Sequence, residues 1–230
     1  MKLLAIDTSS NACSVALQLG DDILEEHVDR EREHTRILVP MIERLIDTGN
    51  VALGELDAVV LGNGPGSFIG MRIGASVAQG LCYGAGLGLV PVSSLAAVAA
   101  EAITEHGADN VLVAQDARMH EVYVGRYHRD ADGLPALRGS EEICRIGELA
   151  DPGDPGANYA AAGAAWQKFP GLMAANRRRI TDVLEICVPR ARHLLGVGAG
   201  VFRAQGAIAP ESLVPAYIRV KVAERPPATG

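Results

Sequence analysis

The chain has 230 residues, of which 48% are hydrophobic and 21% are charged; these proportions are ordinary for a soluble globular protein and exclude a disordered chain. The formal net charge of −7 argues against an autonomous nucleic-acid-binding protein, because such a protein needs a concentrated positive surface. The four cysteines form no Cys-x-x-Cys pair and the first residues do not resemble a signal peptide, so we expect a cytoplasmic protein with reduced thiols.

Short strands and a hairpin open the chain. Leu3–Ile6 is apolar and ends in a polar cluster at 7–11, and further strands are expected at 13–19 and 23–28, on either side of a Gly-Asp-Asp turn. The elements expected after this hairpin are, in order, a helix at 37–46, a strand at 58–61, a helix at 67–83, a strand at 87–92 and a helix at 94–103.

One stretch of the first half resembles a membrane span by its length alone. Residues 73–100 carry no formal charge, and a helix of that length would cross a bilayer. Glycine, proline and serine residues divide the stretch into pieces that are too short to cross. We therefore expect a helix, a buried strand and a helix in a soluble core, without membrane contact.

The pattern of the first half starts again near Val111. Leu3–Asp7 aligns with Leu112–Asp116, and in each copy a second strand follows, at 13–19 and at 121–127. A weak internal repeat of this length predicts two similar α/β lobes. We assign the lobes to residues 1–107 and 108–230. The elements expected in the rest of the second lobe are a loop at 151–156, a strand at 159–165 and a helix at 189–204.

The end of the first strand offers a candidate anion site. Asp7, Thr8 and Ser9 can form a phosphate and metal corner, or can simply close a turn. The glycine-rich loop at 62–67, with Gly64 and Gly66, fits neither a Walker loop nor a dinucleotide fingerprint. It predicts a strand-to-helix turn with Ser67 as the N-cap, and such a helix start can bind an anion or can only pack tightly.

The helix after this loop carries a ridge of small side chains. Glycine in a helix interior costs about 1 kcal/mol relative to alanine, so the ridge predicts the close approach of another helix. That helix can be the one around Leu38 to Ile46 or can belong to another chain, and periodicity does not choose between them. The residues of the ridge, four apart in the sequence, are Gly66, Gly70, Gly74, Ala78 and Cys82.

Other kinds of site receive little support. The six histidines show no HxxxH or HExxH pairing, so no metal site is expected, and His34 is interpreted as a solvated cap of the helix that follows it. Nuclease chemistry of the ribonuclease H type is disfavoured because the strand at 58–61 ends without a carboxylate. The basic run Arg177, Arg178 and Arg179 fits a solvated face and receives no assigned role.

Five segments form a recognisable set, in order, over nearly the whole chain: Met1–Ser9, His34–Ile42, Gly64–Gly74, Asp116–Tyr123 and Pro215–Arg219. Together they resemble the TsaB family of bacterial tRNA threonylcarbamoyladenosine biosynthesis proteins, also called YeaZ. The glycine-rich segment is the most specific part, and Ile69 departs from the threonine usual in the family. The resemblance implies an α/β fold with duplicated ribonuclease H-like lobes, as in the actin-like and sugar-kinase ATPase superfamily.

The resemblance also implies a function. Members of the family are non-catalytic scaffolds that bind and stabilise a TsaD-type subunit, which transfers a threonylcarbamoyl group to the adenosine next to the anticodon of tRNAs reading codons that begin with A. The family contact uses the two helices of the first lobe. The interface residues that follow are Leu38, Met41, Ile42, Leu45, Ile69, Gly70, Ile73, Gly74, Val77 and Ala78.

Cofactor and further partners are expected on the same basis. The chain alone should require no cofactor or metal, although ATP or ADP can lie at a partner interface. The candidate nucleotide or phosphate contacts are Asp7, Thr8, Ser9, Gly64, Gly66 and Ser67. A TsaE-type ATPase should join the assembly, the isolated chain should form a homodimer, and tRNA should be contacted only through the complex.

Two other classes of function stay open. A small ATP-hydrolysing or phosphotransfer enzyme would use Asp7, Thr8 and the loop from Gly64 to Ser67, although the second lobe offers little chain for a full adenosine pocket. A peptidase is the third class. No zinc-ligand spacing and no recognisable nucleophile arrangement supports a peptidase.

Overall fold

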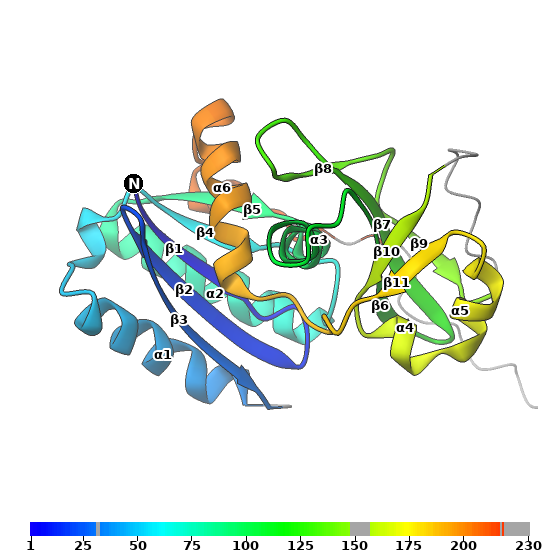
Figure 1. The fold of residues 1–230 in the computed structure, drawn as a ribbon. Coiled ribbons are helices and arrows are strands. Elements are labelled where there is room, and N and C mark those ends of the chain that lie inside the picture. The colour runs from blue at the N-terminus through cyan, green and yellow to red at the C-terminus, as the bar shows by residue number, and fades with distance from the viewer. Residues whose placement is uncertain (31–32, 148–156, 217, 219–230) are drawn as a thin grey trace, which may run out of the picture.

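Two β-sheets lie side by side, with one helix, α3 (Ser94–Thr104), between them (Figure 1). The structure, a computed structural model, describes residues 1–30, 33–147, 157–216 and 218. The predicted loop at 151–156 lies outside the described residues, as do Tyr217 and Arg219 of the last segment quoted above.

The first sheet has five strands in the order β3-β2-β1-β4-β5. The antiparallel β1–β2–β3 meander is followed by parallel pairing of β1 with β4 and of β4 with β5. The predicted order of three strands, helix, strand, helix, strand, helix is confirmed. The bounds are β1 (Lys2–Asp7), β2 (Ala12–Leu19), β3 (Asp22–Asp29), α1 (His34–Thr48), β4 (Ala58–Gly62), α2 (Phe68–Ala85) and β5 (Gly88–Val92), with a short 3-10 turn at Leu53–Glu55.

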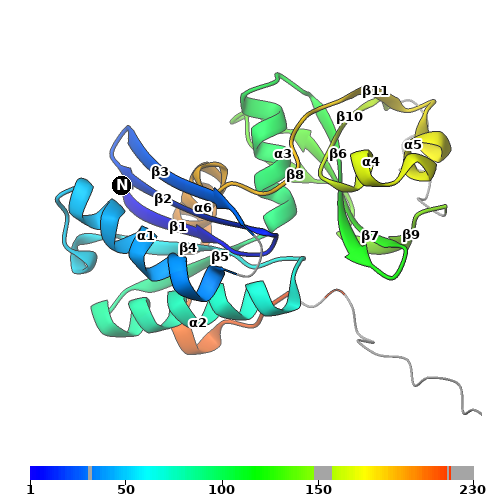
Figure 2. The ribbon, with the colours of Figure 1, turned by 90° about the horizontal axis from the view of Figure 1, so that it is seen from below.

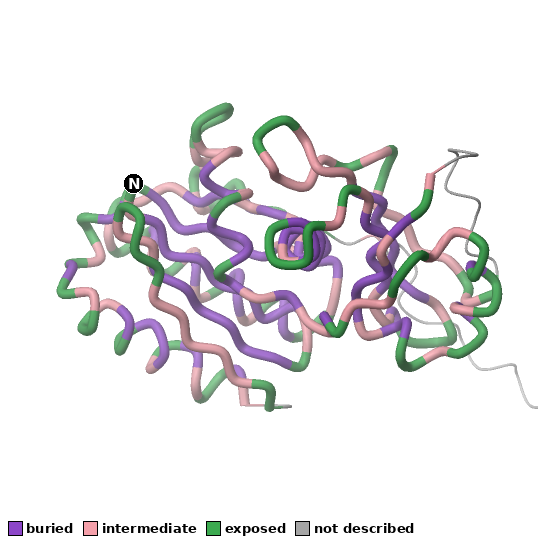
Figure 3. Tube along the Cα trace, in the orientation of Figure 1, coloured by how far each residue is buried: buried purple, intermediate pink, exposed green. Residues whose placement is uncertain are grey.

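Both faces of this sheet are buried, and β1 explains how. Leu4 and Ile6 pack on one face with residues of α1 and α2, while Leu3 and Ala5 pack on the other. Figure 1 shows α1 and α2 along the first of these faces, and Figure 3 shows that β1 is buried along most of its length. A strand that is apolar at consecutive positions suits a sheet covered on both sides. The other face is covered by α3 and by α6 (Ala191–Gln205), the C-terminal helix.

The second sheet repeats the first. Its main order, β11-β10-β6-β7-β8, matches the first when β6 is set on β1, because β6 pairs antiparallel with the next strand and parallel with β10. The aligned Asp7 and Asp116 end equivalent strands. The bounds are β6 (Asn110–Arg118), β7 (Glu121–Arg129), β8 (Pro135–Leu137), β9 (Glu142–Arg145), β10 (Tyr159–Ala162), α4 (Ala165–Lys168), α5 (Pro170–Asn176) and β11 (Ile180–Val183).

Three details of the second half differ from the expected elements. The strand expected at 159–165 ends at Ala162, because Gly163 has a φ of +110° and turns the chain into α4. Strands β8, β9 and β11 and helices α4 and α5 were not predicted. They are short or weakly periodic, so a sequence pattern has little to detect.

The C-terminal helix α6 requires a correction to the predicted 108–230 lobe. It packs on the first sheet rather than the second, against the face that carries Val60; a Cβ at Gly198 would touch that side chain (Figure 2). Ile208 also bridges to Leu89 of β5. The boundary at 107 therefore separates the strands of the two sheets but not all of the elements that cover them.

The uncharged stretch at 73–100 forms most of α2, then β5 and the first part of α3, as expected from its breaks. Within the described residues, no helix combines the length and the apolar character needed to cross a membrane.

Candidate functional site

A cleft of about 560 Å³ lies between the two lobes. The loop after β1 and the start of α2 line it from the first lobe, and the end of β6 with α4 lines it from the second. Of the residues expected to contact a nucleotide or phosphate, Ser9, Gly66 and Ser67 line this cleft. The other three, Asp7, Thr8 and Gly64, are buried and lie outside the lining.

Asp7 is enclosed by hydrogen-bond donors. Its Oδ1 accepts bonds from the backbone N–H and the hydroxyl of Ser9, both at 2.8 Å, and its Oδ2 accepts one from the hydroxyl of Ser94 at 2.7 Å. Only 1% of Asp7 is exposed. Burial raises the pKa of Asp7 to about 6, against the lowering effect of these hydrogen bonds. In this structure Asp7 closes a turn and lies outside the cleft lining, and its role as a phosphate contact stays a prediction.

The small residues of the ridge on α2 pack against the same turn. A Cβ added at Gly70 would overlap the backbone oxygen of Thr8, and one at Gly66 would overlap that of Ser9. The hydroxyl of Thr8 donates to the carbonyl oxygen of Gly70 at 2.8 Å. The close approach that the glycines allow is therefore to the end of β1 within the same chain, and not to another helix.

Ser67 is the N-cap of α2, as predicted. Its hydroxyl accepts from the backbone N–H of Gly70 at 3.2 Å, and its own N–H donates to the carbonyl oxygen of Ser9 at 2.6 Å. These contacts hold the start of α2 against the loop after β1 at the edge of the cleft.

The charged groups of the cleft come from the second lobe. Asp116, which aligns with Asp7 in the repeat, lies 2.6 Å from the Nζ of Lys168 and 3.6 Å from a guanidinium nitrogen of Arg118. Partial burial raises the pKa of Asp116, but hydrogen bonds from Lys168 and from the backbone of Arg118, with the charges of both side chains, outweigh it and hold the pKa below its usual value. The repeat could have identified Asp116 as a cleft residue; nothing in the sequence indicated Lys168.

Most of the predicted partner interface is inside the monomer. The inward residues of α1 pack on β2 and its neighbours, so they contribute to the core of the first lobe. His34 at the start of α1 is also buried, and its Nε2 lies 3.1 Å from the carbonyl oxygen of Ala12, so it is not a solvated cap. The interface residues that the structure buries are Leu38, Met41, Ile42, Leu45, Gly70, Gly74 and Ala78.

The side of α2 opposite the ridge of small residues is partly exposed to solvent. Ile69 is 70% exposed, Ile73 and Val77 are half-buried, and Tyr83 is 67% exposed. At Gly80, on the same side, an added Cβ would have nothing within 4 Å. We call these five residues the α2 outer stripe. Helix α2, which carries this stripe, lies beside α1 (Figure 2).

Comparison with known proteins identifies the family. The family model described as "TsaD: tRNA N6-adenosine threonylcarbamoyltransferase" matches residues 26–200. The tRNA threonylcarbamoyladenosine biosynthesis protein TsaB of Escherichia coli is 36% identical to this chain, over 97% of the chain and 96% of that protein. The chain belongs to the TsaB family. The TsaB of Haemophilus influenzae is 34% identical, over 96% of this chain and 95% of its own length.

Solved structures agree with this family. A crystal structure from Pseudomonas aeruginosa, described as an uncharacterized protein with similarity to peptidase YeaZ, has a TM-score of 0.88 and 36% identity, and the match covers 95% of this chain and 99% of that one. A second structure, YeaZ from the same species, has a TM-score of 0.84 at 35% identity, over 94% of this chain and 99% of that one. The TsaB resemblance and the duplicated α/β fold expected from it are therefore confirmed.

Proposed function

We propose that this chain is a non-catalytic subunit in the biosynthesis of threonylcarbamoyladenosine in tRNA, and that it binds and stabilises a TsaD-type transferase. The α2 outer stripe carries the proposal. A large apolar residue that is 70% exposed, as Ile69 is, with further apolar residues along the same helix side, is typical of a surface that another protein covers. Family membership supplies the kind of partner.

The surroundings of Asp7 at the end of β1 support a scaffold rather than an enzyme. Asp7 is the carboxylate that a phosphotransfer enzyme of this fold would be expected to use, and here its oxygens are already bonded to Ser9 and Ser94 beneath the cleft. Among the described residues that line the cleft there is no histidine and no cysteine. The peptidase hypothesis therefore gains no support.

The remaining partners follow as parts of the same proposal. Ile69 belongs both to the α2 outer stripe and to the cleft lining, so ATP or ADP bound in the cleft would lie beside a docked partner. In the absence of that partner, the same stripe would pair two copies of this chain. The net charge of −7 favours tRNA contact through the complex, which a TsaE-type ATPase would join.

The experiment is a binding titration with the TsaD-type subunit of the same organism. Ile69→Glu introduces a charge into the α2 outer stripe without touching the core, so the monomer should fold normally while the affinity falls by more than about tenfold. Ile23→Glu is the matched control, because Ile23 is an exposed isoleucine on the edge strand β3, and it should bind as the wild type does.

Equal affinity of wild type and Ile69→Glu would contradict the proposed surface. Loss of binding in both variants would indicate that the surface is not confined to α2. Activity of the reconstituted transferase, measured with the same variants, should fall in parallel with binding if this chain acts by stabilising its partner.

A second function is favoured by Lys168 and Arg118, which bring positive charge to the cleft beside Asp116. We propose nucleotide binding there as the alternative, either as a ligand of the complex or as the substrate of a small ATP-hydrolysing or phosphotransfer enzyme. Calorimetric titration of Lys168→Gln with Mg-ATP tests it.

A further inference from the structure

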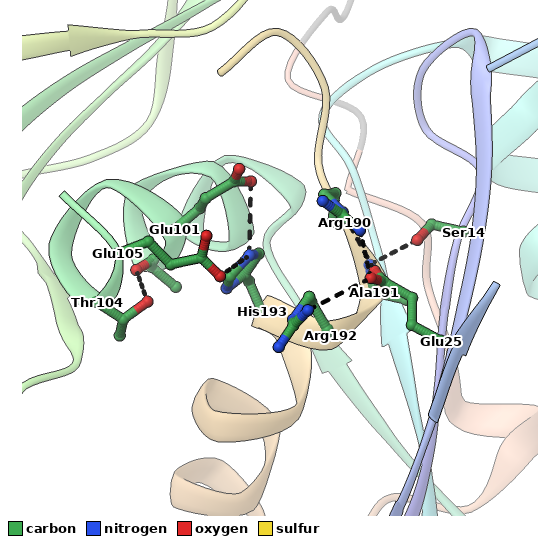
Figure 4. A network of polar contacts seen from close by, with 10 residues as sticks. Ser14, Glu25, Glu101, Thr104, Glu105, Arg190, Ala191, Arg192 and His193 are labelled. Atoms are coloured by element: carbon green, nitrogen blue, oxygen red, sulfur yellow. Dashed lines mark hydrogen bonds and ion pairs between the residues drawn. The ribbon is translucent and has the colours of Figure 1, made fainter. Parts of the chain in front are cut away.

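A second cluster of ionisable side chains lies away from the cleft, where α3 meets α6 (Figure 4). Glu101 and Glu105 are one turn apart at the end of α3, and His193 is in the first turn of α6. One carboxylate oxygen of each glutamate and the Nε2 of His193 all lie within 4.8 Å of one another. The three ligand types, two carboxylates and an imidazole, are those that zinc and related divalent cations use in proteins.

His193 points into this cluster without an ordinary partner. It is 8% exposed, and its Nε2 has no hydrogen-bond partner among the described residues. The Oε2 of Glu101 is buried and lacks a hydrogen bond within the same part of the chain. Since buried polar atoms are almost always hydrogen-bonded, two such atoms facing one another indicate a group that would lie between them.

The separations suit a shared cation better than a direct bond. The Nε2 of His193 is 3.6 Å from the Oε2 of Glu101 and 3.4 Å from the Oε1 of Glu105. A charge-assisted hydrogen bond would bring these atoms to about 2.7–2.9 Å. Two ligands that each lie about 2.1 Å from a tetrahedral cation are about 3.4 Å apart, which is the spacing present here.

The charges around the cluster leave room for a cation. Arg190 and Arg192 are the nearby positive groups, and both pair with Glu25 of β3, at 2.5 and 3.9 Å. In the described part of the chain neither arginine forms an ion pair with Glu101 or Glu105, so the two carboxylates are open to another cation.

The geometry points to a binding site for a divalent transition-metal cation of the zinc class, held by Glu101, Glu105 and His193. The fourth position would be open to solvent, since the side chain of Glu105 is 46% exposed. The site belongs to the fold and not to the cleft: by joining α3 to α6 it would fasten the C-terminal helix to the helix between the sheets. Sequence spacing could not reveal it, because the histidine is 88 residues from the nearer glutamate.

The test uses Zn²⁺ alone, titrated calorimetrically into the full chain after chelator treatment. We expect one equivalent to bind. Glu105→Gln and His193→Gln should each weaken binding by more than about 100-fold, because even outer partners of metal ligands contribute 10- to 100-fold. Glu105→Gln changes a half-exposed side chain and should keep the fold. The matched control His120→Gln removes an exposed histidine of the turn between β6 and β7, outside the cluster, and should leave the affinity unchanged.

Binding of Co²⁺ gives an independent readout. Nitrogen and oxygen ligands in a tetrahedral site produce visible d–d absorption without the near-ultraviolet band of a thiolate ligand, and the thermal transition of the chain should move upward with added metal. The inference is overturned if no equivalent of Zn²⁺ binds, if all variants bind alike, or if the Co²⁺ spectrum shows a thiolate band.

Discussion

Asp7 and Asp116 end equivalent strands of the two lobes, yet the structure gives them opposite surroundings. Asp7 is buried, accepts three hydrogen bonds from serines and has a raised pKa. Asp116 faces the cleft, pairs with Lys168 and has a lowered pKa. A duplicated fold thus preserves the position of a carboxylate but not its chemistry.

The difference arises from the residues that pack against each strand end. In the first lobe Asp7 is closed off by Gly62 of β4, where an added Cβ would overlap its Oδ2, and by the hydroxyl of Ser94 at the start of α3. In the second lobe the short helix α4 supplies Lys168 from its last residue and leaves the cleft open. The comparison teaches that the residues packed around a strand end decide which of two related sites can meet a ligand.

The largest expected effect comes from closing the space between α2 and the end of β1. Gly70→Val should lower the free energy of unfolding by about 4 kcal/mol, because its Cβ would overlap the backbone oxygen of Thr8, which cannot rotate away. Urea denaturation measures the change. Gly80→Val places the same side chain on the open side of α2 and should alter stability by less than about 0.5 kcal/mol. Equal losses in both variants would contradict this packing.

Titration of the two carboxylates should give opposite signs. The pKa of Asp7 has its ordinary value of 3.8 in the unfolded chain and rises to about 6 in the folded chain. Between these pH values only the folded chain keeps the proton. The free energy of unfolding of the wild type therefore falls by up to about 3 kcal/mol as the pH rises through this range. Asp7→Asn cannot ionise, and its stability relative to wild type should rise by that amount from pH 4 to pH 7.

The matched variant Asp116→Asn should behave in reverse. A lowered pKa stabilises the fold above the unfolded pKa, and that contribution is lost as the pH falls, so this variant should lose stability relative to wild type as the pH rises. Denaturation series from pH 3 to pH 7 compare the two variants. The same sign in both would show that the two environments do not differ as described.

The smallest change in stability is expected at Lys168. The side chain is 50% exposed, so Lys168→Gln should cost less than about 1 kcal/mol of unfolding free energy. If the cleft holds a nucleotide, however, the affinity for Mg-ATP measured by calorimetric titration should fall about tenfold, since one charge-assisted contact is lost. Lys2→Gln removes an exposed lysine outside the cleft lining and is the control. Unchanged affinity of Lys168→Gln for Mg-ATP would show that the nucleotide does not bind in the cleft.

Much of the first lobe could be predicted because its elements have strong periodicity. Residues alternating between two buried faces in β1, helical spacing in α1 and the N-cap Ser67 all appear in the sequence before the fold is known. The direction of the glycine ridge could not be predicted in this way. Periodicity identifies a helix side that packs closely, but it does not say whether a helix, a strand end or another chain lies against it.

The turn between β6 and β7 shows a second limit. Arg118, Met119 and His120 all have positive φ values between 54° and 63°, a conformation that sequence rules associate with glycine and asparagine. The turn is set by the pairing of the flanking strands rather than by its own residues. Arg118 reaches the cleft from this turn, so its place in the site depended on tertiary structure.

The return of α6 to the first sheet has a consequence for synthesis of the protein. During translation, β1 to β5 leave the ribosome long before residues 191–205, and until then the sheet face that carries Val60 lacks the helix that buries it. In the nascent N-terminal half, this face of the first sheet therefore stays without its α6 cover until α6 has been synthesised. This interval is when a chaperone would be most needed, and it ties completion of the first lobe to emergence of nearly the entire polypeptide.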